Sequence, residues 1–423
     1  MSECCDVVVV GAGMVGAAFA CAATAGGLQV RVLDNVAPQP ANGRGEYDLR
    51  VSAITRASQR LFQNLGAWET MAGLRVSPFR EMHVWDAGGR GAIHFDSAEV
   101  GEPTLGHIVE NRVVQTALLQ RLAELDPSAL QTPVRIVRLA VEPGQVRVEL
   151  DKGEALSAGL VVGADGANSL VRREAGIAIR GWSYDQRALV ATVRPEKHHR
   201  ETAWQRFLPG GPLAFLPLGD GRCSIVWSTN PEHAQQLLDL EEDAFRQALA
   251  EAFDHRLGVI EHCGPRAAFP LRLQHSLRYV APRLALIGDA AHTVHPLAGQ
   301  GVNLGLLDAA ALAEVLKQAR SRGRAPGALE TLRRYERWRK GENLASMAVM
   351  DGFKRLFGTG AAPVRLLRNL GLQAFDAAAP LKNAIIRRAM GLSGDLPALC
   401  RSGGAPEQSP ARAGRSGTET QQF

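Results

Sequence analysis

The sequence predicts an α/β protein in which a doubly wound, Rossmann-like domain is interleaved with a mixed β-sheet domain and followed by C-terminal helices. A run of valines leads into a glycine turn and a small-residue helix, the pattern of a buried parallel strand feeding a helix. Alternating apolar segments broken by Pro and Gly fill residues 188–228, and helical spacing dominates after Asp308. With 423 residues, 46% hydrophobic and 22% charged, the chain is globular and too long for one ordinary core.

The first predicted unit is β-α-β, made of "DVVVV", a helix ending near Ala25 and "QVRVLD". Further helices are expected near residues 56–65, 111–125 and 243–253, with strands at "VRIVRLAVE", "VRVELDKG", "GLVVGADGANS" and "AAFPLRL". The end of the chain is rich in Gly, Ser, Pro and Gln without periodicity, which predicts disorder. The resulting domain prediction is residues 1–75, 106–181 and 276–345 for the Rossmann-like domain, 76–105 and 182–275 for the β-sheet domain, 346–398 for a helical region and 399–423 for a disordered tail.

The stretch Val7–Leu28 has no charged residue and is long enough to span a bilayer. Its five glycines and small side chains instead indicate a buried strand and helix. The six cysteines show no zinc-ligand spacing, so we expect reduced thiols and no metal site. No signal peptide is recognisable before Asp6, so a cytoplasmic location is expected.

Charge is concentrated in one region of the chain. The net charge of +5 is modest for this length, and no nucleic-acid partner is expected. Between Gly352 and Gly394, however, the only acid is Asp376. The basic residues there are Lys354, Arg355, Arg365, Arg368, Lys382, Arg387 and Arg388. Apolar residues recur among them at helical spacing, which predicts a packed stripe and a basic face; that face either meets an acidic surface or is simply solvated.

The turn "GAGMVG" carries Gly11, Gly13 and Gly16 between a strand and a helix, and Asp34 ends the next strand. The glycines permit a tight turn and close backbone approach, the helix N-terminus faces a pyrophosphate, and the aspartate accepts from ribose hydroxyls. A glycine-rich packing turn is the alternative, but here strand, helix, second strand and acid are all present. The pattern predicts dinucleotide binding without deciding between NAD and FAD.

Two more apolar strands end in an aspartate, Asp165 in "VVGADGANS" and Asp289 in "LIGDAAH". Alone, each is compatible with an ordinary Asx turn. Together with the glycine fingerprint, they resemble the aromatic-hydroxylase family of FAD-dependent monooxygenases. The resemblance implies an FAD-binding Rossmann-like domain in which Gly288 and Asp289 reach the ribityl chain and pyrophosphate. It also implies that Asp165 and Gly166 lie near both FAD and the pyridine nucleotide.

The loop after Asp289 is expected to reach the isoalloxazine ring of the cofactor. Its Gly-Gln-Gly turn would set backbone N–H groups and the start of the next helix against the pyrimidine edge of the ring. That edge becomes anionic on reduction, and a helix dipole with free amides stabilises such charge. The cofactor-binding residues predicted in this region are Pro296, Gly299, Gln300, Gly301 and Asn303.

Five segments narrow the resemblance to the ubiquinone-biosynthesis hydroxylases, and within them to the 2-polyprenylphenol hydroxylase branch. They are "LRVSAIT", "LGHIVEN", "AFLPL", "CSIVWS" and "AAHTVHPLAGQGVNLG", and the match runs from about Asp6 to Leu396. The resemblance implies Arg50 near the pyrophosphate, Arg112 near the cofactor, and hydroxylation of a polyprenylated phenol with O₂ through a flavin hydroperoxide. Because one dinucleotide fingerprint is present, NAD(P)H is expected to dock transiently, or another donor to reduce the flavin.

His295 is the best-placed candidate for a catalytic residue, because it precedes the ring-facing part of the loop and could assist phenol deprotonation. A histidine that only hydrogen-bonds the loop backbone is an equal alternative. His292 is expected to be structural, and Tyr184, His94 and His107 are weaker candidates.

Several functions and partners stay open at this point. The rivals are a sister ubiquinone-pathway hydroxylase acting at another ring position, a hydroxylase of a soluble phenol, a flavin reductase that does not use O₂, and a lipid-binding subunit. A polyprenyl tail is too apolar to diffuse in water, at about 0.8 kcal/mol per CH₂. We therefore expect contact through residues 352–394 with the inner membrane or with a ubiquinone-biosynthesis complex, and a homo-oligomer.

Overall fold

The computed structural model describes residues 3–41, 43–89, 91–151, 153–293, 301–358 and 378–403. In these residues an eight-stranded sheet is built from β1 (Glu3–Val10), β2 (Val30–Leu33), β8 (Leu130–Gln131), β9 (Ile136–Glu142), β10 (Gln145–Leu150), β11 (Ala155–Gly163), β18 (Val280–Ala281) and β19 (Leu284–Leu286). The strand order is β18-β19-β11-β1-β2-β8, and β10 and β9 extend from β11. The central pairs β2–β1, β1–β11 and β11–β19 are parallel, which confirms the predicted Rossmann-like sheet.

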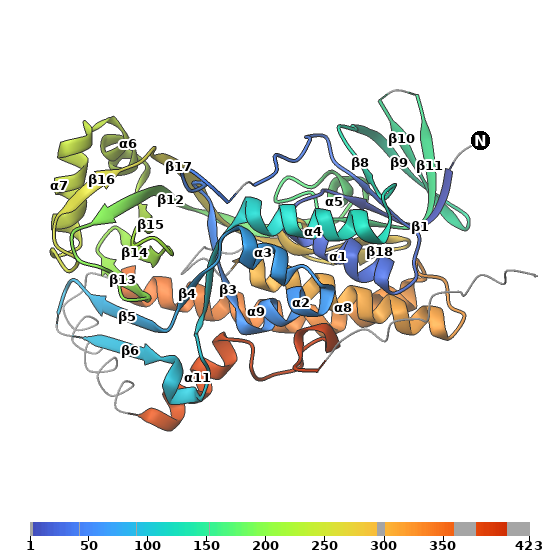
Figure 1. Cartoon of the computed structure of the whole chain (residues 1–423). Helices are drawn as coiled ribbons and strands as arrows, with labels where there is room; N and C mark the ends of the chain where they lie inside the picture. The colour runs from blue at the N-terminus through green and yellow to red at the C-terminus, as the bar shows by residue number, and fades with distance from the viewer. Residues whose placement is uncertain are drawn as a thin grey trace, which may run out of the picture.

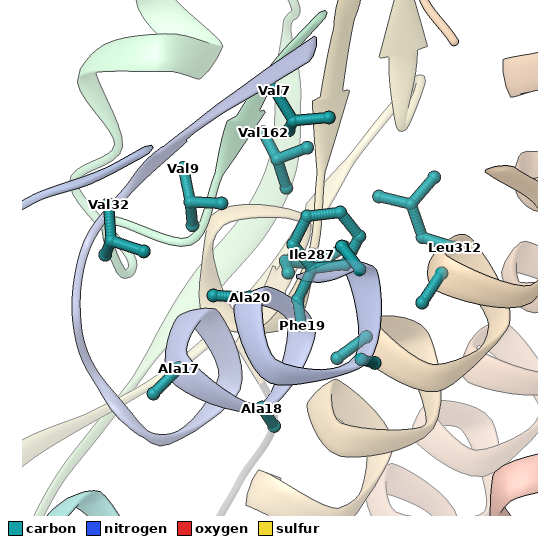
Figure 2. Close-up of a cluster of buried hydrophobic side chains, with 14 of the residues drawn as sticks. Val7, Val9, Ala17, Ala18, Phe19, Ala20, Val32, Val162, Ile287 and Leu312 are labelled. Carbon is teal, nitrogen blue, oxygen red and sulfur yellow. The ribbon is translucent and has the colours of Figure 1, made fainter. Parts of the chain in front are cut away.

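Helices pack beside this sheet, some against its strands and others against neighbouring helices. They are α1 (Met14–Ala25), α2 (Arg56–Leu65), α3 (Trp68–Leu74), α4 (Asn111–Leu125), α5 (Leu170–Glu174), α8 (Gly301–Ser321) and α9 (Leu329–Gly358). The boundaries of α2 and α4 are those predicted from the sequence. Figure 2 shows Val9 of β1, Phe19 of α1 and Leu312 of α8 around one buried core. The alanines of α1 let it approach both the sheet and α8, so the uncharged stretch predicted to be a strand and helix is buried in protein.

The second sheet has nine strands in the described part of the chain: β5 (Glu81–Asp86), β6 (Ala92–Asp96), β12 (Ile179–Pro195), β13 (Thr202–Leu208), β14 (Gly211–Pro217), β15 (Cys223–Thr229), β16 (Ile260–Cys263), β17 (Ala267–Ser276) and β20 (His292–Thr293). It is mixed, as predicted, because β13 runs parallel to β5 while its other neighbour is antiparallel. The helices α6 (Pro231–Asp239) and α7 (Glu242–Ala252) pack against it.

A three-stranded sheet of β3 (Val51–Thr55), β7 (Gly106–Glu110) and β4 (Ser77–Phe79) joins the two regions. Figure 1 shows the large sheets at opposite ends of the molecule, with α9 running lengthwise from one to the other. Short helices η1 (Ser97–Val100), η2 (Gly288–Ala290) and η4 (Ala398–Cys400) and the helix α11 (Ala379–Ala389) complete the described elements. In these residues, no helix has both the length and the apolar character needed to cross a bilayer.

The predicted disordered tail began too early, at residue 399. Cys400 is fully buried, and the Asn64 side-chain amide donates to the carbonyl of Leu399 at 2.8 Å. Both residues are apolar and precede the Ser/Gly-rich composition on which the prediction rested. The chain is therefore packed to Cys400; residues 401–403 are exposed, and residues 404–423 lie outside the described residues.

The predicted basic face is corrected at Lys382. The ammonium of Lys382 is buried and lies 3.0 Å from the Glu99 carboxylate, and Arg387 donates to the carbonyl of Val100 at 2.9 Å. Arg388 pairs with Glu342 of α9. These contacts tie α11 to η1 and α9, and they remove the Lys382 ammonium from the surface, whereas Arg387 and Arg388 stay exposed. The side chains of Lys354, Arg355, Arg365 and Arg368 lie outside the described residues.

Candidate active site

Residues 11–16 form the first turn, which we call the nucleotide cradle. Its three glycines serve different purposes. Gly11 has a φ of +104°, and a Cβ on it would lie 2.5 Å from the carbonyl oxygen of Ala164. A Cβ on Gly16 would lie 2.0 Å from the oxygen of Gly11, so packing alone excludes side chains at both positions. At Gly13 an added Cβ would meet nothing within 4 Å. The cradle therefore keeps open space beside Gly13, where a phosphate would need it.

The start of α1 has the features of an anion-binding site. Gly13 is its N-cap, and no side chain caps the free N–H groups. Asp34 closes the turn, since its two carboxylate oxygens accept from Ala12 N at 2.7 Å and from Val36 N at 2.9 Å. Each oxygen keeps a further acceptor site, which fits a ribose hydroxyl. These features suit the pyrophosphate and ribose of a dinucleotide.

The structure adds two neighbours of the cradle. The side-chain amide of Gln115 donates to the oxygen of Ala12 at 2.8 Å, a contact that the sequence did not predict. Arg112 lies one turn earlier on α4 and therefore on the same face of the helix. Its guanidinium lies 3.5 Å from the Asp48 carboxylate, in a cleft that Tyr47 also lines. The i, i+3 spacing of Arg112 and Gln115 was the available signal.

Asp165 follows β11 and caps α5. One carboxylate oxygen accepts from the backbone N–H of Leu170 at 2.6 Å and of Val171 at 3.2 Å. The other oxygen is buried and has no hydrogen-bond partner among the described residues. Because buried polar atoms are almost always paired, this oxygen is an acceptor available to a ligand.

Three elements meet tightly beside the cradle. Gly288 of η2 has a φ of +59°, and a Cβ on it would lie 3.1 Å from a methyl group of Val15 in α1. A Cβ on Gly305 of α8 would lie 2.8 Å from the other methyl group of Val15 and 2.9 Å from the Cα of Gly288. Small residues thus bring η2 and α8 into contact with the first turn of α1.

Asp289 stands at this junction with Arg50 nearby. Its side chain opens to solvent and has no hydrogen bond to any described residue. Protein packed around the carboxyl nevertheless desolvates it and raises its pKa, while the charges of His292 and Arg50 act to lower it. An aspartate and an arginine that do not bond to each other suit the hydroxyl and phosphate groups of one ligand.

The start of α8 is tied to β3. Asn303 is buried; its oxygen accepts from the backbone N–H of Thr55 at 3.0 Å, and its amide donates to Ala53 O at 2.7 Å. Asn303 was predicted to bind the cofactor, and this amide positions the helix start. Gly301 begins α8. The other residues predicted there, His295, Pro296, Gly299 and Gln300, lie outside the described residues.

A buried ionic network holds the helices below this junction, and sequence reasoning missed it. Asp308 of α8 is 0% exposed and accepts from Nε2 of His292 at 2.5 Å and from Arg339 of α9 at 2.9 Å. It also accepts from Asn343 at 3.0 Å and from the backbone N–H of Gly288 at 3.3 Å. Burial alone would raise the pKa of Asp308, but these partners outweigh it and hold the pKa below its usual value. His292 is thus structural, as predicted.

A second cavity, which we call the ring pocket, lies between the three-stranded sheet, the nine-stranded sheet and α11. It holds about 120 Å³. The lining residues are Ala53, Ile54, Thr55, Phe79, Met82, Phe95, Leu105, Ile108, Ala203, Trp204, Gln205, Ala214, Leu216, Ile385, Ile386, Ala389 and Met390. Thr55 also bonds to Asn303 at the start of α8, so the pocket borders the place where the cofactor ring was predicted. An almost entirely apolar lining suits an aromatic ring with an apolar substituent.

The weaker catalytic candidates lie elsewhere. Tyr184 donates to Asp351 at 3.2 Å. His107 is buried against Trp68; burial, and then the charge of Arg56, lowers its pKa to about 4, so it is neutral near pH 7. Neither residue lines the ring pocket.

His94 belongs to a cluster with Glu81 and His83 whose ligand atoms are close enough for a metal ion. The Glu81 carboxylate lies 3.1 Å from Nε2 of His94 and 3.7 Å from Nε2 of His83. The two imidazole rings, however, are stacked at 4.2 Å and inclined by only 23°. Their nitrogen lone pairs therefore lie in nearly parallel planes about 4 Å apart, whereas the ligands of one ion must converge. The arrangement as it stands does not fit a metal site.

Comparison with known proteins gives a consistent result along almost the whole chain. The family model described as FAD binding domain matches residues 4–347. The chain is 40% identical to the 3-demethoxyubiquinol 3-hydroxylase of Escherichia coli, over 92% of this chain and 98% of that protein. It is 42% identical to the ubiquinone hydroxylase UbiL of Rhodospirillum rubrum, over 91% and 89%. It is 39% identical to the human mitochondrial ubiquinone biosynthesis monooxygenase COQ6, over 90% and 91%.

Solved structures show the same fold at lower identity. The p-nitrophenol 4-monooxygenase PnpA of Pseudomonas putida superposes with a TM-score of 0.76 and 19% identity, over 93% of this chain and 100% of that one. A probable FAD-dependent monooxygenase of Pseudomonas aeruginosa, PqsL, gives 0.73 and 24%, over 88% and 100%. At these identities the likeness concerns architecture alone.

Proposed function

Because the chain belongs to the FAD-dependent aromatic-ring hydroxylases of ubiquinone biosynthesis, we propose that its substrate is a polyprenylated phenol, a 2-polyprenylphenol. The observation that carries this proposal is the ring pocket, which is apolar and borders the start of α8. Its volume of about 120 Å³ is close to the roughly 150 Å³ of an apolar protein cavity that binds benzene. The pocket therefore suits one lightly substituted ring, and a prenyl tail must extend beyond it.

The residues described above fit FAD, which when bound supplies the activation of O₂. The N–H groups at the start of α1 and Arg50 would hold the pyrophosphate, and Asp34 a ribose hydroxyl. Asp289, and the unpaired oxygen of Asp165, would accept from hydroxyls of the cofactor. The start of α8 would direct its positive end at the ring system.

The chain's own contribution to the reaction is orientation and exclusion of water. Ile386 and Met390 of the C-terminal segment close the ring pocket against Phe79 and Leu105. An aromatic ring held there is shielded from solvent, which limits side reactions with water during oxygen transfer. His295 stays our candidate for assisting phenol deprotonation.

NAD(P)H is proposed as the transient reductant, because one dinucleotide fingerprint is present in the sequence and FAD accounts for it. NAD(P)H oxidation with stoichiometric O₂ consumption and product formation would support a monooxygenase. NAD(P)H oxidation without O₂ uptake would instead indicate a reductase, and FAD binding without turnover a lipid-binding subunit.

A sister reaction at another ring position is the second candidate. The relative from Escherichia coli is named for a demethoxyubiquinol, a quinol with two ring hydroxyls where a phenol has one. Quinone-intermediate profiling in a strain lacking this gene separates the two candidates. Accumulation of a polyprenylphenol supports the first proposal, and accumulation of a demethoxyubiquinone or demethoxyubiquinol replaces it with the second.

Access to the membrane-bound substrate is proposed to involve the basic segment 352–394, as a contact with anionic lipid or with an acidic partner in a ubiquinone-biosynthesis complex. Each Lys or Arg near an anionic surface contributes about 1 kcal/mol. Because Lys382, Arg387 and Arg388 are already bonded within the chain, the test uses Arg365→Glu with Arg368→Glu. Liposome association should fall in a salt-sensitive way while FAD content stays unchanged. The homo-oligomer remains a prediction.

A further inference from the structure

One amide interrupts the apolar wall of the ring pocket. Gln205 of β13 is 5% exposed and is one of the pocket's lining residues. Its neighbours on the pocket wall are alanine, leucine, isoleucine, methionine and phenylalanine side chains, apart from Thr55 and Trp204. A glutamine at such a position is unusual, because its amide loses water and gains no apolar contact in return.

The pleat of β13 directs this amide toward the pocket. Trp204 lies on the opposite face of the strand, where its indole stacks on the His83 ring at 4.7 Å. Gln205 shares its own face with Ala203, and Ala214 is its partner on the adjacent strand β14. Both alanines are buried in the cluster that faces the FAD-binding region. The side chain of Gln205 therefore projects over small residues that leave room in front of it.

The Gln205 side chain has no hydrogen bond to any part of the chain that the structure describes. The other two polar side chains at the pocket are accounted for differently. Thr55 is bonded to Asn303 and Ser58. The indole N–H of Trp204 also has no partner among the described residues, but this atom is fully buried, so a molecule in the cavity does not reach it unless the side chain moves. Buried amides are normally paired, so an unpaired one at a cavity wall indicates a missing ligand. Gln205 is the polar group free to bind what enters the pocket.

We propose that Gln205 hydrogen-bonds to the oxygen substituent of the substrate ring and is the positioning residue that selects which ring carbon is presented for hydroxylation. The inference rests on the proposed function, since it needs an aromatic substrate. An amide can donate to a phenolate and can both donate to and accept from a phenol. It binds the oxygen in either protonation state and takes no proton itself. Because the rest of the wall is apolar, this one bond fixes the rotation of the ring in the pocket.

The test is a comparison of two ligands by calorimetry on the FAD-loaded protein. One ligand is a short-chain 2-prenylphenol, and the other is the same molecule without the hydroxyl group. The wild-type protein should bind the phenol about tenfold more tightly, as one hydrogen bond in a buried site allows. Gln205→Met keeps the side-chain length and removes the amide, so the two affinities should become equal while binding of the deoxygenated ligand is retained. Gln235→Met, at an exposed glutamine of α6, is the matched control and should keep the tenfold preference.

A second measurement separates positioning from mere packing. With the 2-prenylphenol, Gln205→Met should hydroxylate more than one ring carbon or release more H₂O₂ per O₂ consumed. Gln205→Asn is used if the methionine variant fails to fold. Its side chain is one methylene group shorter, so it should also reduce the preference for the phenol over the ligand without the hydroxyl group. An unchanged tenfold preference in these variants overturns the assignment of Gln205. If the wild-type protein binds neither ligand, the proposed function itself fails.

Discussion

The nucleotide cradle and the ring pocket are both buried, but they are built in opposite ways. The cradle comes from one short stretch, residues 11–16, and packs backbone against backbone so closely that Gly16 has no room for a methyl group. The ring pocket is assembled from residues between Ala53 and Met390, and it keeps about 120 Å³ of space. In the function that we propose, the cradle binds the invariant phosphates of FAD through backbone N–H groups. The pocket would bind the variable substrate ring through side chains, so substrate preference could change there without disturbing the fold.

The largest expected effect tests the tightness of the cradle. Gly16→Val drives a side chain into the Gly11 carbonyl and should cost more than about 4 kcal/mol of unfolding free energy, leaving little folded protein. Gly13→Ala meets open space and an extended backbone, so the FAD-free protein should keep its stability to within about 0.5 kcal/mol. Its FAD affinity should fall, because the methyl group occupies the phosphate's place. Urea denaturation and FAD titration measure both, and normal FAD affinity in Gly13→Ala would contradict the open-space interpretation.

The next effect concerns the ionic network beneath the cradle. Asp308→Asn leaves Arg339 buried without its counter-charge and should lower the unfolding free energy by about 3–5 kcal/mol. The control is Glu342→Gln, which removes a solvent-exposed pair with Arg388 and should cost less than about 1 kcal/mol. Chemical denaturation measures both variants. Equal losses of unfolding free energy would show that the buried network stabilises the fold no more than the exposed pair does.

Asp289 lies between the two regions, and its substitution should affect binding more than folding. Asp289→Ala removes a carboxylate that bonds to no described residue, so the FAD-free protein should be at least as stable as the wild type. FAD affinity should fall roughly ten- to hundredfold, the value of about 1.5–3 kcal/mol for a hydrogen bond to a charged group. Fluorescence titration measures the FAD affinity of the variant. An affinity equal to that of the wild-type protein would exclude Asp289 from the cofactor site.

His107, on the reverse face of the strand that lines the ring pocket, gives a pH-dependent effect. Burial lowers its pKa from 6.5 to about 4, so the unfolded chain binds a proton over that interval while the folded chain does not. Stability should therefore be complete above pH 6.5 and decline as the pH falls toward 4, by up to ~3 kcal/mol. His107→Gln should flatten the pH dependence of unfolding, and His262→Gln, at an exposed position, should not. Burial also lowers the pKa of His275 to about 4, so the His107→Gln variant should keep the part of the pH dependence of unfolding that comes from His275.

A modest effect on stability is expected where the pocket has room. Ala214→Phe adds a ring to the cavity and should change the unfolding free energy by no more than about 1–3 kcal/mol, with FAD retained. Calorimetric binding of a short-chain 2-prenylphenol should be abolished. Retained binding would place the substrate ring elsewhere.

The cradle was predictable from the sequence because its signal is local. A strand, three glycines, a helix and Asp34 occur within one short segment, and each has a fixed geometric task. The alternation in β9 and β10 and the spacing in α2 and α4 were equally local, and the structure has these elements where they were expected. The buried network was less accessible. Asp308 in an Ala/Leu helix was a visible anomaly, but nothing local indicated that Arg339 and Asn343 would meet it.

The ring pocket could not be derived from the sequence in the same way. Its walls come from strands and a helix far apart in the chain, and which face of β13 looks inward depends on pairing with β14 and β5. Arg387 and Lys382 were expected on a free basic face because composition records charge and not partners. Their partners, Val100 and Glu99, are nearly 300 residues earlier in the chain.

The position of β19 has a consequence for how the protein is made. This strand pairs with β11 and completes the parallel sheet, yet it is translated only after the nine-stranded sheet has been almost entirely synthesised. Until residue 286 has left the ribosome, Val161–Gly163 at the end of β11 lack their partner strand, and the side of α1 that later meets α8 is uncovered. An open parallel edge beside an apolar surface is prone to association with other chains. The nascent N-terminal half should therefore depend on chaperones until the second sheet has emerged, and should not be stable as a separate fragment.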